Sequence, residues 1–171
     1  MDRTYRRLTA AALLALAAPA LAEVTANAPD GFTVVHKSTA NVPPAAMWRA
    51  LLDWQGWWPA AHSYSGSAAN LSLNPVAGGA LREKWAGGEV LHATVLQART
   101  ERLLRLDGAF GPLQAMPVTA IMDLALAPDG TGTKISLTYR VSGPAIGQFA
   151  PAVDSVLSDA FTQLAAHRRE Q

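Results

Sequence analysis

Short runs of alternating apolar and polar residues, separated by turns rich in glycine and proline, fill most of the chain between residues 71 and 142. The clearest run is 134–141, in which every second residue is apolar: Ile135, Leu137, Tyr139 and Val141. Such alternation predicts strands that bury one face of a sheet, and short turns join neighbouring strands in antiparallel fashion. The centre of the chain is therefore predicted to form an antiparallel meander of about six strands.

Helical periodicity flanks this meander on both sides. A first strand at 32–42 ends at Pro43-Pro44, and residues 45–54 then place apolar side chains three and four positions apart. A short aromatic segment at 55–65 follows as a second short helix. The last segment, about residues 146–169, has the same spacing and predicts one long amphipathic helix. This order of elements indicates an α+β domain.

Residues 1–22 have the three-part layout of a secretory signal peptide. Arg3, Arg6 and Arg7 precede an almost wholly apolar run at 8–18, and Ala20-Leu21-Ala22 is a small-x-small cleavage site. The apolar run is well below the ~20 residues that a transmembrane anchor needs. We expect cleavage after Ala22 and a mature protein that is periplasmic or secreted, without stable membrane insertion. Ordinary secretion is favoured, and twin-arginine export stays open.

Residues 23–31 are polar, so we expect a loosely held N-terminal arm, and we assign residues 32–171 to a single domain. The whole chain has 14 basic and 13 acidic residues; without the leader, which holds three Arg and one Asp, 11 basic and 12 acidic residues remain. This near-neutral balance gives no support for a nucleic-acid partner, which would need a clustered basic face.

The chain contains no cysteine, which excludes disulfides, iron–sulfur clusters, thiolate zinc sites and a cysteine nucleophile. Its four histidines are dispersed and form no H-x-x-x-H pair. We therefore expect neither a metal nor a cofactor.

Several motifs resemble those of the START/SRPBCC helix-grip superfamily (polyketide cyclase/dehydrase and lipid-transport-like). The stretch 32–48 is similar to a family opening in which an apolar strand leads through a proline-marked turn to a helix with an apolar-Trp pair, here Met47-Trp48. Residues 61–66 (AHSYSG) and 106–114 (LDGAFGPLQ), with Leu71-Ser72-Leu73, Gly78-Gly79 and His92 between them, resemble a bacterial exported subgroup. The resemblance covers about residues 32–164.

The resemblance implies a helix-grip fold. This is a curved antiparallel sheet of about seven strands, with two short helices after the first strand and a long C-terminal helix across the sheet. In the superfamily the helix and sheet leave a cavity for apolar ligands. Members include lipid carriers, aromatic polyketide cyclases, hormone receptors and activators of chaperone ATPases, so the fold does not decide the activity.

Glu83 is the most unusual residue of the predicted sheet, because it shares a face with the apolar Leu81 and Trp85. A carboxylate on such a face is costly unless it is paired or hydrated. A four-residue turn at 86–89 would place His92 opposite Glu83 and make a cross-strand pair at the cavity wall. A two-residue turn would instead turn Leu91 inward and His92 outward. The pair would either orient a ligand, act as base and acid, or serve structure alone.

Other candidate ligand-binding residues follow from the predicted inner faces. With Glu83, Trp85 and His92, the expected cavity wall comprises Leu104, Leu106, Val118, Ala120, Met122, Leu137 and Tyr139 of the sheet and Val153 and Val156 of the long helix. The expected cavity entrance comprises Trp57, Trp58, His62 and Tyr64, which could equally be packing residues of the second helix.

Three functions remain open from the sequence. The favoured one is non-enzymatic binding or transport of a small hydrophobic or aromatic molecule, possibly a lipid. The second is a cyclase/dehydrase-type enzyme that uses His92 and Glu83 in the same cavity. The third is a protein-interaction module, with no partner identified, which predicts an exposed apolar patch at Trp57 and Trp58.

Overall fold

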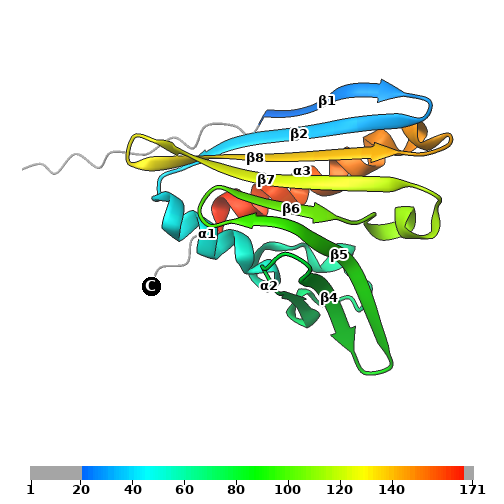
Figure 1. The fold of residues 1–171 in the computed structure, drawn as a ribbon, viewed down its shortest axis with the longest axis horizontal. Helices are drawn as coiled ribbons and strands as arrows, with labels where there is room; N and C mark the ends of the chain where they lie inside the picture. The colour runs from blue at the N-terminus through cyan, green and yellow to red at the C-terminus, as the bar shows by residue number, and fades with distance from the viewer. Residues whose placement is uncertain (1–20, 168–171) are drawn as a thin grey trace, which may run out of the picture.

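One continuous sheet of eight antiparallel strands forms the body of the protein (Figure 1). The computed structural model describes residues 21–167, with side chains from residue 24 onward, so most of the predicted signal peptide lies outside the described residues. The strand order is β1-β2-β8-β7-β6-β5-β4-β3. The strands are β1 (Leu21–Ala28), β2 (Gly31–Ala40), β3 (Leu71–Leu73), β4 (Ala80–Trp85), β5 (Gly88–Arg99), β6 (Leu103–Asp107), β7 (Thr119–Asp129) and β8 (Gly132–Ser142).

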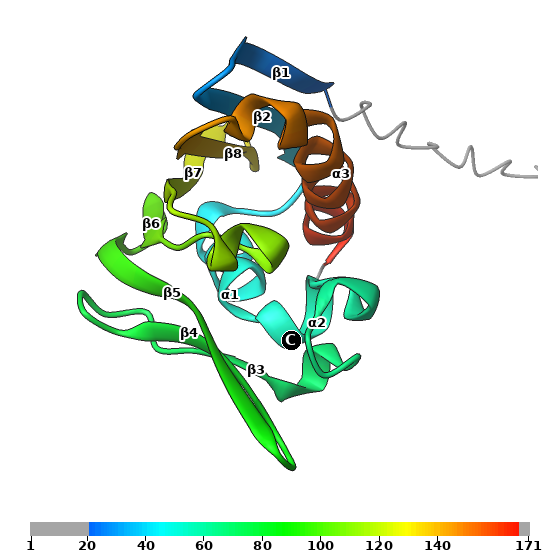
Figure 2. The same ribbon diagram turned by 90° about the vertical axis from the view of Figure 1, so that its right-hand side faces the viewer.

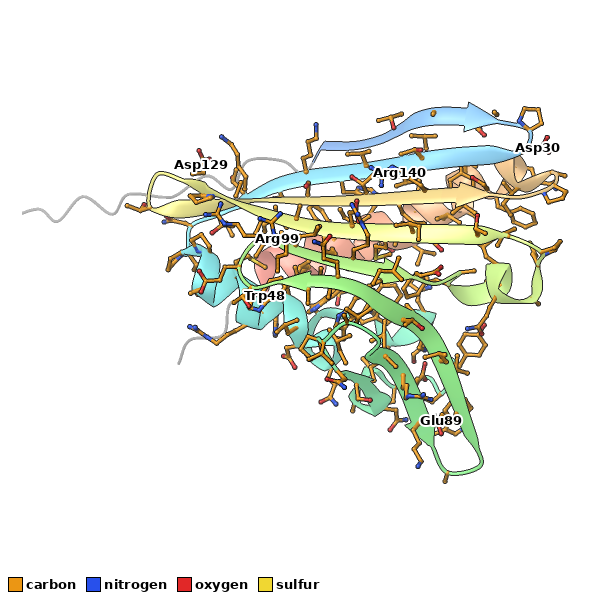
Figure 3. The ribbon with its side chains drawn as sticks, in the orientation of Figure 1. Asp30, Trp48, Glu89, Arg99, Asp129 and Arg140 are labelled. Atoms are coloured by element: carbon orange, nitrogen blue, oxygen red, sulfur yellow. The ribbon has the colours of Figure 1, made fainter. Side chains whose placement is uncertain are left out.

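The predicted alternation sets which face of the sheet is buried. In β8, Ile135, Leu137, Tyr139 and Val141 are all buried, while the residues between them are half-buried or exposed. On the opposite face, Asp123 of β7 accepts hydrogen bonds from Arg105 Nε at 2.6 Å and from Arg140 Nη1 at 3.2 Å. Arg140 and Arg99 are labelled on this outer face in Figure 3. The apolar side of the sheet therefore needs a cover, and the other side carries the charges.

Three helices provide that cover. The long helix α3 (Ala150–Ala166) packs on β1 and β2, α1 (Pro44–Leu52) packs on β7 and β8, and the short α2 (Trp54–Trp57) lies against β3. Figure 2 shows the sheet curving around this helical side. Four 3-10 segments complete the described part of the chain: η1 (Ala60–His62), η2 (Ala68–Asn70), η3 (Gly111–Ala115) and η4 (Ile146–Phe149). The predicted helix-grip architecture is confirmed. Among residues 21–167, no helix has the length and apolarity to cross a membrane.

The expected N-terminal arm at 23–31 is instead strand β1 and its turn, which raises the number of strands to eight. β1 pairs with β2 from Leu21↔Lys37 to Ala28↔Gly31 across a turn at Pro29-Asp30. The segment after β8 holds this turn, because Gly147 N donates to Pro29 O and Ala145 N to Asp30 Oδ1. β1 is an edge strand, which pairs on one side only and can be largely polar. Its sequence therefore lacks the apolar alternation that would predict a strand.

A buried imidazole lies where α3 crosses β2. His36 shares the inner face of β2 with Phe32 and Val34 and is fully buried. Its Nε2 lies 3.2 Å from Asp154 Oδ1 of α3, an ion-pair distance without hydrogen-bond geometry, and its ring packs against Phe161. Burial lowers the pKa of His36 below its ordinary 6.5, and the nearby Asp154 opposes this shift only in part.

The lowered pKa of His36 predicts acid sensitivity of the fold. As the pH falls below about 6.5, the unfolded chain binds a proton at this residue before the folded protein does, so stability decreases. We expect His36→Gln to flatten the loss of unfolding free energy measured by urea denaturation between about pH 7.5 and about pH 5. His62→Gln, at an exposed histidine, is the matched control. Equal slopes in the wild type and His36→Gln would contradict the prediction.

Candidate functional site

A cavity of about 600 Å³ lies between one face of α3 and two loops that follow α2 and β6. This volume is within the range of small-molecule sites, about 300–1,000 Å³. Among the described residues, no Asp, Glu, Lys or Arg lines it. The lining residues are Trp58, Ala61, His62, Ser63, Tyr64, Phe110, Gly111, Pro112, Leu113, Tyr139, Phe149, Ala152, Val153, Val156 and Leu157.

Aromatic rings form the inner end of the cavity. The Phe110 ring centroid lies 5.9 Å from that of Trp58 and 5.8 Å from that of Tyr139, the latter edge-on. The Tyr139 hydroxyl donates to Gly108 O at 3.0 Å and accepts from Phe110 N at 3.2 Å. Burial raises the pKa of Tyr139 well above its usual value, so the hydroxyl stays neutral and holds the loop in place. This end of the cavity is a fixed apolar wall.

Tyr64 connects the two loops at the solvent side of the cavity. Its side chain is 48% exposed, yet its hydroxyl donates to Gly111 O at 2.9 Å. Gln114 extends this link, since its Nε2 donates to Leu91 O at 2.6 Å while its Oε1 lies 3.4 Å from the Tyr64 hydroxyl. Tyr64 thus bridges the rim of the cavity from the η1 side to the η3 side.

The Glu83 carboxylate fixes the loop that contains Tyr64 through hydrogen bonds to its backbone. Glu83 is fully buried, and it accepts hydrogen bonds from Tyr64 N at 3.0 Å, Ser65 N at 2.6 Å and His92 Nε2 at 2.9 Å. Burial by itself raises the pKa of Glu83, but the hydrogen bonds from Ser65, Tyr64 and His92 together outweigh burial and leave the pKa below its usual value. Glu83 is therefore ionised, and His92 Nε2–H is the donor to it.

The predicted Glu83–His92 pair forms, but not by the predicted register. The turn between β4 and β5 has two residues, Ala86 and Gly87, so that Glu83 is opposite Val90. A β-bulge then shifts the pairing between Leu81 and Arg82, and the extra residue on β5 is His92. Leu91, opposite the exposed Arg82, is on the outer face and 44% exposed, whereas His92 follows Val90 onto the inner face with Glu83. The bulge changes the face only of the residues that follow it, so Ala93 is buried next to His92. The two-residue turn therefore keeps His92 on the same face as Glu83, and the expectation that such a turn would place His92 outside and Leu91 inside is wrong.

Only part of the predicted wall lines the cavity. Tyr139, Val153 and Val156 do so, as do Trp58, His62 and Tyr64 of the predicted entrance. Glu83 and His92 lie behind the rim: the His92 ring centroid is 5.6 Å from that of Tyr64, and neither residue of the pair is in the lining. Trp85 and Val118, both half-buried, are also outside the lining. The remaining predicted wall residues belong to the packed core instead: Leu104, Leu106, Ala120, Met122 and Leu137.

The predicted patch at Trp57 and Trp58 is not exposed. The two side chains are 1% and 7% accessible, and both indoles have hydrogen-bond partners: Trp57 Nε1 donates to Leu51 O at 3.1 Å and Trp58 Nε1 to His62 O at 3.2 Å. Rings of Trp54, Trp57 and Trp58 pack on one another within 5.8 Å. The exposed apolar patch that the interaction-module hypothesis requires is therefore not present at Trp57 and Trp58.

Sequence reasoning missed the loop after β6 as a wall of the cavity. Phe110, Gly111, Pro112 and Leu113 all line it, and they form no periodic pattern that would assign them to a face. A signal was present in Gly111, whose φ of +58° favours glycine and marks a fixed turn. Phe149, Ala152 and Leu157 were also missed, because the helical stripe alone does not tell a packed residue from a cavity-lining one.

The described part of the chain contains no group of three His, Asp or Glu side chains that could hold a metal ion. The polar contacts of the site instead hold its loops. The geometry provides an apolar binding space with fixed walls and a bridged rim.

A sheet wrapped around one long C-terminal helix, with an apolar cavity beneath that helix, defines a helix-grip protein of the START/SRPBCC superfamily. The chain belongs to the family described as "Polyketide cyclase / dehydrase and lipid transport", which matches residues 31–168. No curated protein matches the sequence.

Solved structures share this fold at low sequence identity. CalU16 from Micromonospora echinospora is 16% identical over 85% of this chain and 81% of its own, with a TM-score of 0.59. Protein CV1439 from Chromobacterium violaceum is 19% identical over 81% and 98% of the two chains, with a TM-score of 0.56. Mll3558 from Rhizobium loti is 20% identical over 80% and 96%, with a TM-score of 0.57. At such identities the likeness establishes the fold alone.

The hydrogen bonds of Glu83 predict a large effect of its removal. Glu83→Ala leaves Tyr64 N, Ser65 N and His92 without their acceptor, and we expect a loss of about 3–5 kcal/mol of unfolding free energy in urea denaturation near neutral pH. Because the pKa of Glu83 is lowered, this contribution is present above about pH 4.5 and declines as the pH falls further.

Glu89→Ala is the matched control, since Glu89 lies near the exposed tip of the same hairpin (Figure 3). Its ion pair with Arg82, at 2.8 Å, is exposed on both sides, so we expect a cost below about 1 kcal/mol. Similar losses in the two variants would show that the buried carboxylate does not hold the rim.

Proposed function

We propose that this protein binds a small hydrophobic or aromatic molecule, in the chemical range that includes lipids, inside the cavity beneath α3. The observation that carries this proposal is the cavity itself, about 600 Å³ in volume, with no Asp, Glu, Lys or Arg among the described residues that line it. The family description, which names lipid transport beside polyketide cyclisation and dehydration, is consistent with an apolar ligand. Aromatic rings at its inner end offer faces on which a flat or acyl ligand packs.

Binding without catalysis is the simpler use of this site. The Glu83–His92 pair was the candidate acid and base for a cyclase/dehydrase reaction, and neither residue lines the cavity. Glu83 already accepts three hydrogen bonds and is fully buried. A catalytic acid or base must come within hydrogen-bond reach of the atom it serves, and this pair is occupied in holding the Tyr64 loop.

Filling the cavity is the direct test of ligand binding. Val156 faces the cavity from α3, so we expect Val156→Trp to weaken binding of the fluorescent apolar probe N-phenyl-1-naphthylamine at least about tenfold, because the larger side chain occupies the space of the ligand. Val76→Trp, at a loop residue that is 54% exposed, is the matched control and should bind like the wild type. No probe binding by the wild type, or equal binding by Val156→Trp, would refute the proposal.

We further propose that the chain is exported and loses residues 1–22. The Arg-rich start, apolar run and Ala20-Leu21-Ala22 site support export, and the family match begins only at residue 31. Cleavage after Ala22 keeps residues 23–28 of β1 available to pair with β2.

Intact-mass measurement on protein recovered from the periplasmic fraction of a Gram-negative host tests the export proposal. We expect a mature chain that begins at Glu23, and we expect Ala20→Lys to block processing, because signal peptidases require a small residue there. Recovery of the full-length chain from the cytoplasmic fraction alone would overturn the proposal. Native mass spectrometry of the same recovered protein would also detect a co-purifying ligand.

A further inference from the structure

Three of the four histidines lie at ion-pair distance from a carboxylate. His92 Nε2 lies 2.9 Å from Glu83, His167 Nε2 lies 2.9 Å from Asp53, and His36 Nε2 lies 3.2 Å from Asp154. His62 differs from all three. Within residues 21–167 its imidazole has neither an ion-pair nor a hydrogen-bond partner, and its side chain lines the cavity.

The backbone around His62 is fixed even though its ring is free. His62 N donates to Pro59 O at 2.9 Å, and His62 O accepts from Trp58 Nε1 at 3.2 Å. The neighbouring Ser63 donates its hydroxyl proton to Ala60 O at 2.8 Å, so that its oxygen is left as an acceptor. The imidazole is thus carried next to the aromatic wall, and among the described residues it is the lining side chain whose ring N–H has no partner.

The lining also determines which head group this position suits. Within residues 21–167 no acidic side chain lines the cavity, and the carboxylate behind the rim, Glu83, is buried and already accepts three hydrogen bonds. A cationic head group would therefore find no counter-charge, whereas an acidic one would meet the His62 imidazole. The apolar body of such a ligand would lie against Trp58, Phe110 and Val153.

We propose that the cavity prefers amphipathic ligands with an apolar body and an acidic head group of the carboxylate class, and that His62 is the residue that determines this preference. This inference rests on the proposed binding function and adds the chemistry of the ligand to it. It assigns His62 a role in recognition, distinct from the framework roles of the three paired histidines.

A head-group series with one common body tests the proposal. We would displace bound N-phenyl-1-naphthylamine with 2-naphthylacetic acid, 2-naphthylacetamide and 2-(2-naphthyl)ethylamine, which share the naphthyl group of the probe. For the wild type we expect the acid to displace at a concentration at least about fivefold lower than the amide, with the amine the weakest. In His62→Leu the acid-to-amide ratio should fall close to one, and in His62→Lys the preference for the acid should return.

Lys84→Leu is the control for general electrostatics, since it removes an exposed cation from β4 that does not line the cavity. It should leave the acid-to-amide ratio unchanged. An equal ratio in the wild type and His62→Leu would overturn the inference while leaving the binding function intact, as would failure of all three compounds to displace a bound probe. Absence of probe binding in the wild type would reject the binding function and the inference together.

Discussion

The structure depends on the need to cover one apolar face of a wide sheet. Eight strands about 4.8 Å apart span roughly 34 Å, whereas a helix with its side chains is about 10 Å across. The single long helix α3 therefore covers only the β1–β2 side, and α1 and α2 pack on β7, β8 and β3. The space left beside α3, closed by the loops after α2 and β6, is the cavity, so the binding space follows from how the sheet is covered.

The side chains that stabilise this arrangement differ between the two ends of the sheet's inner face. Where helices pack directly on strands, aliphatic residues such as Leu104, Leu124 and Leu137 are fully buried and fill the interior. Around the cavity, aromatic rings replace them: Phe110 packs edge-on against Tyr139 and at a tilt against Trp58. Trp58 and Tyr139 are also fixed by hydrogen bonds from their side chains to backbone carbonyls. Rings fixed in this way keep a space open that flexible aliphatic side chains would otherwise fill.

The fold could be predicted from the sequence because strand alternation and helical spacing are local patterns, as 134–141 and the α3 segment show. The site could be predicted only in part. Glu83 stood out as a carboxylate on an apolar face, and strand alternation places His92 on the same face, but the pairing register depends on the turn length and on a β-bulge, which leave no periodic trace. The loop at Phe110 was missed for a related reason: an irregular segment has no face that a pattern can assign.

The placement of charge explains how a cavity this apolar is compatible with many polar groups nearby. Arg105 and Arg140 both donate hydrogen bonds to Asp123 on the outer face, where their guanidinium groups keep the pKa of Asp123 below its usual value. Glu83 is buried, and its carboxylate accepts hydrogen bonds from the backbone of the loop that contains Tyr64. Because these charged groups are hydrogen-bonded within the protein and do not line the cavity, they contribute little to the choice of ligand head group. In our proposal the preference for a head group is set by His62, the cavity-lining polar side chain that has no hydrogen-bond or ion-pair partner among the described residues.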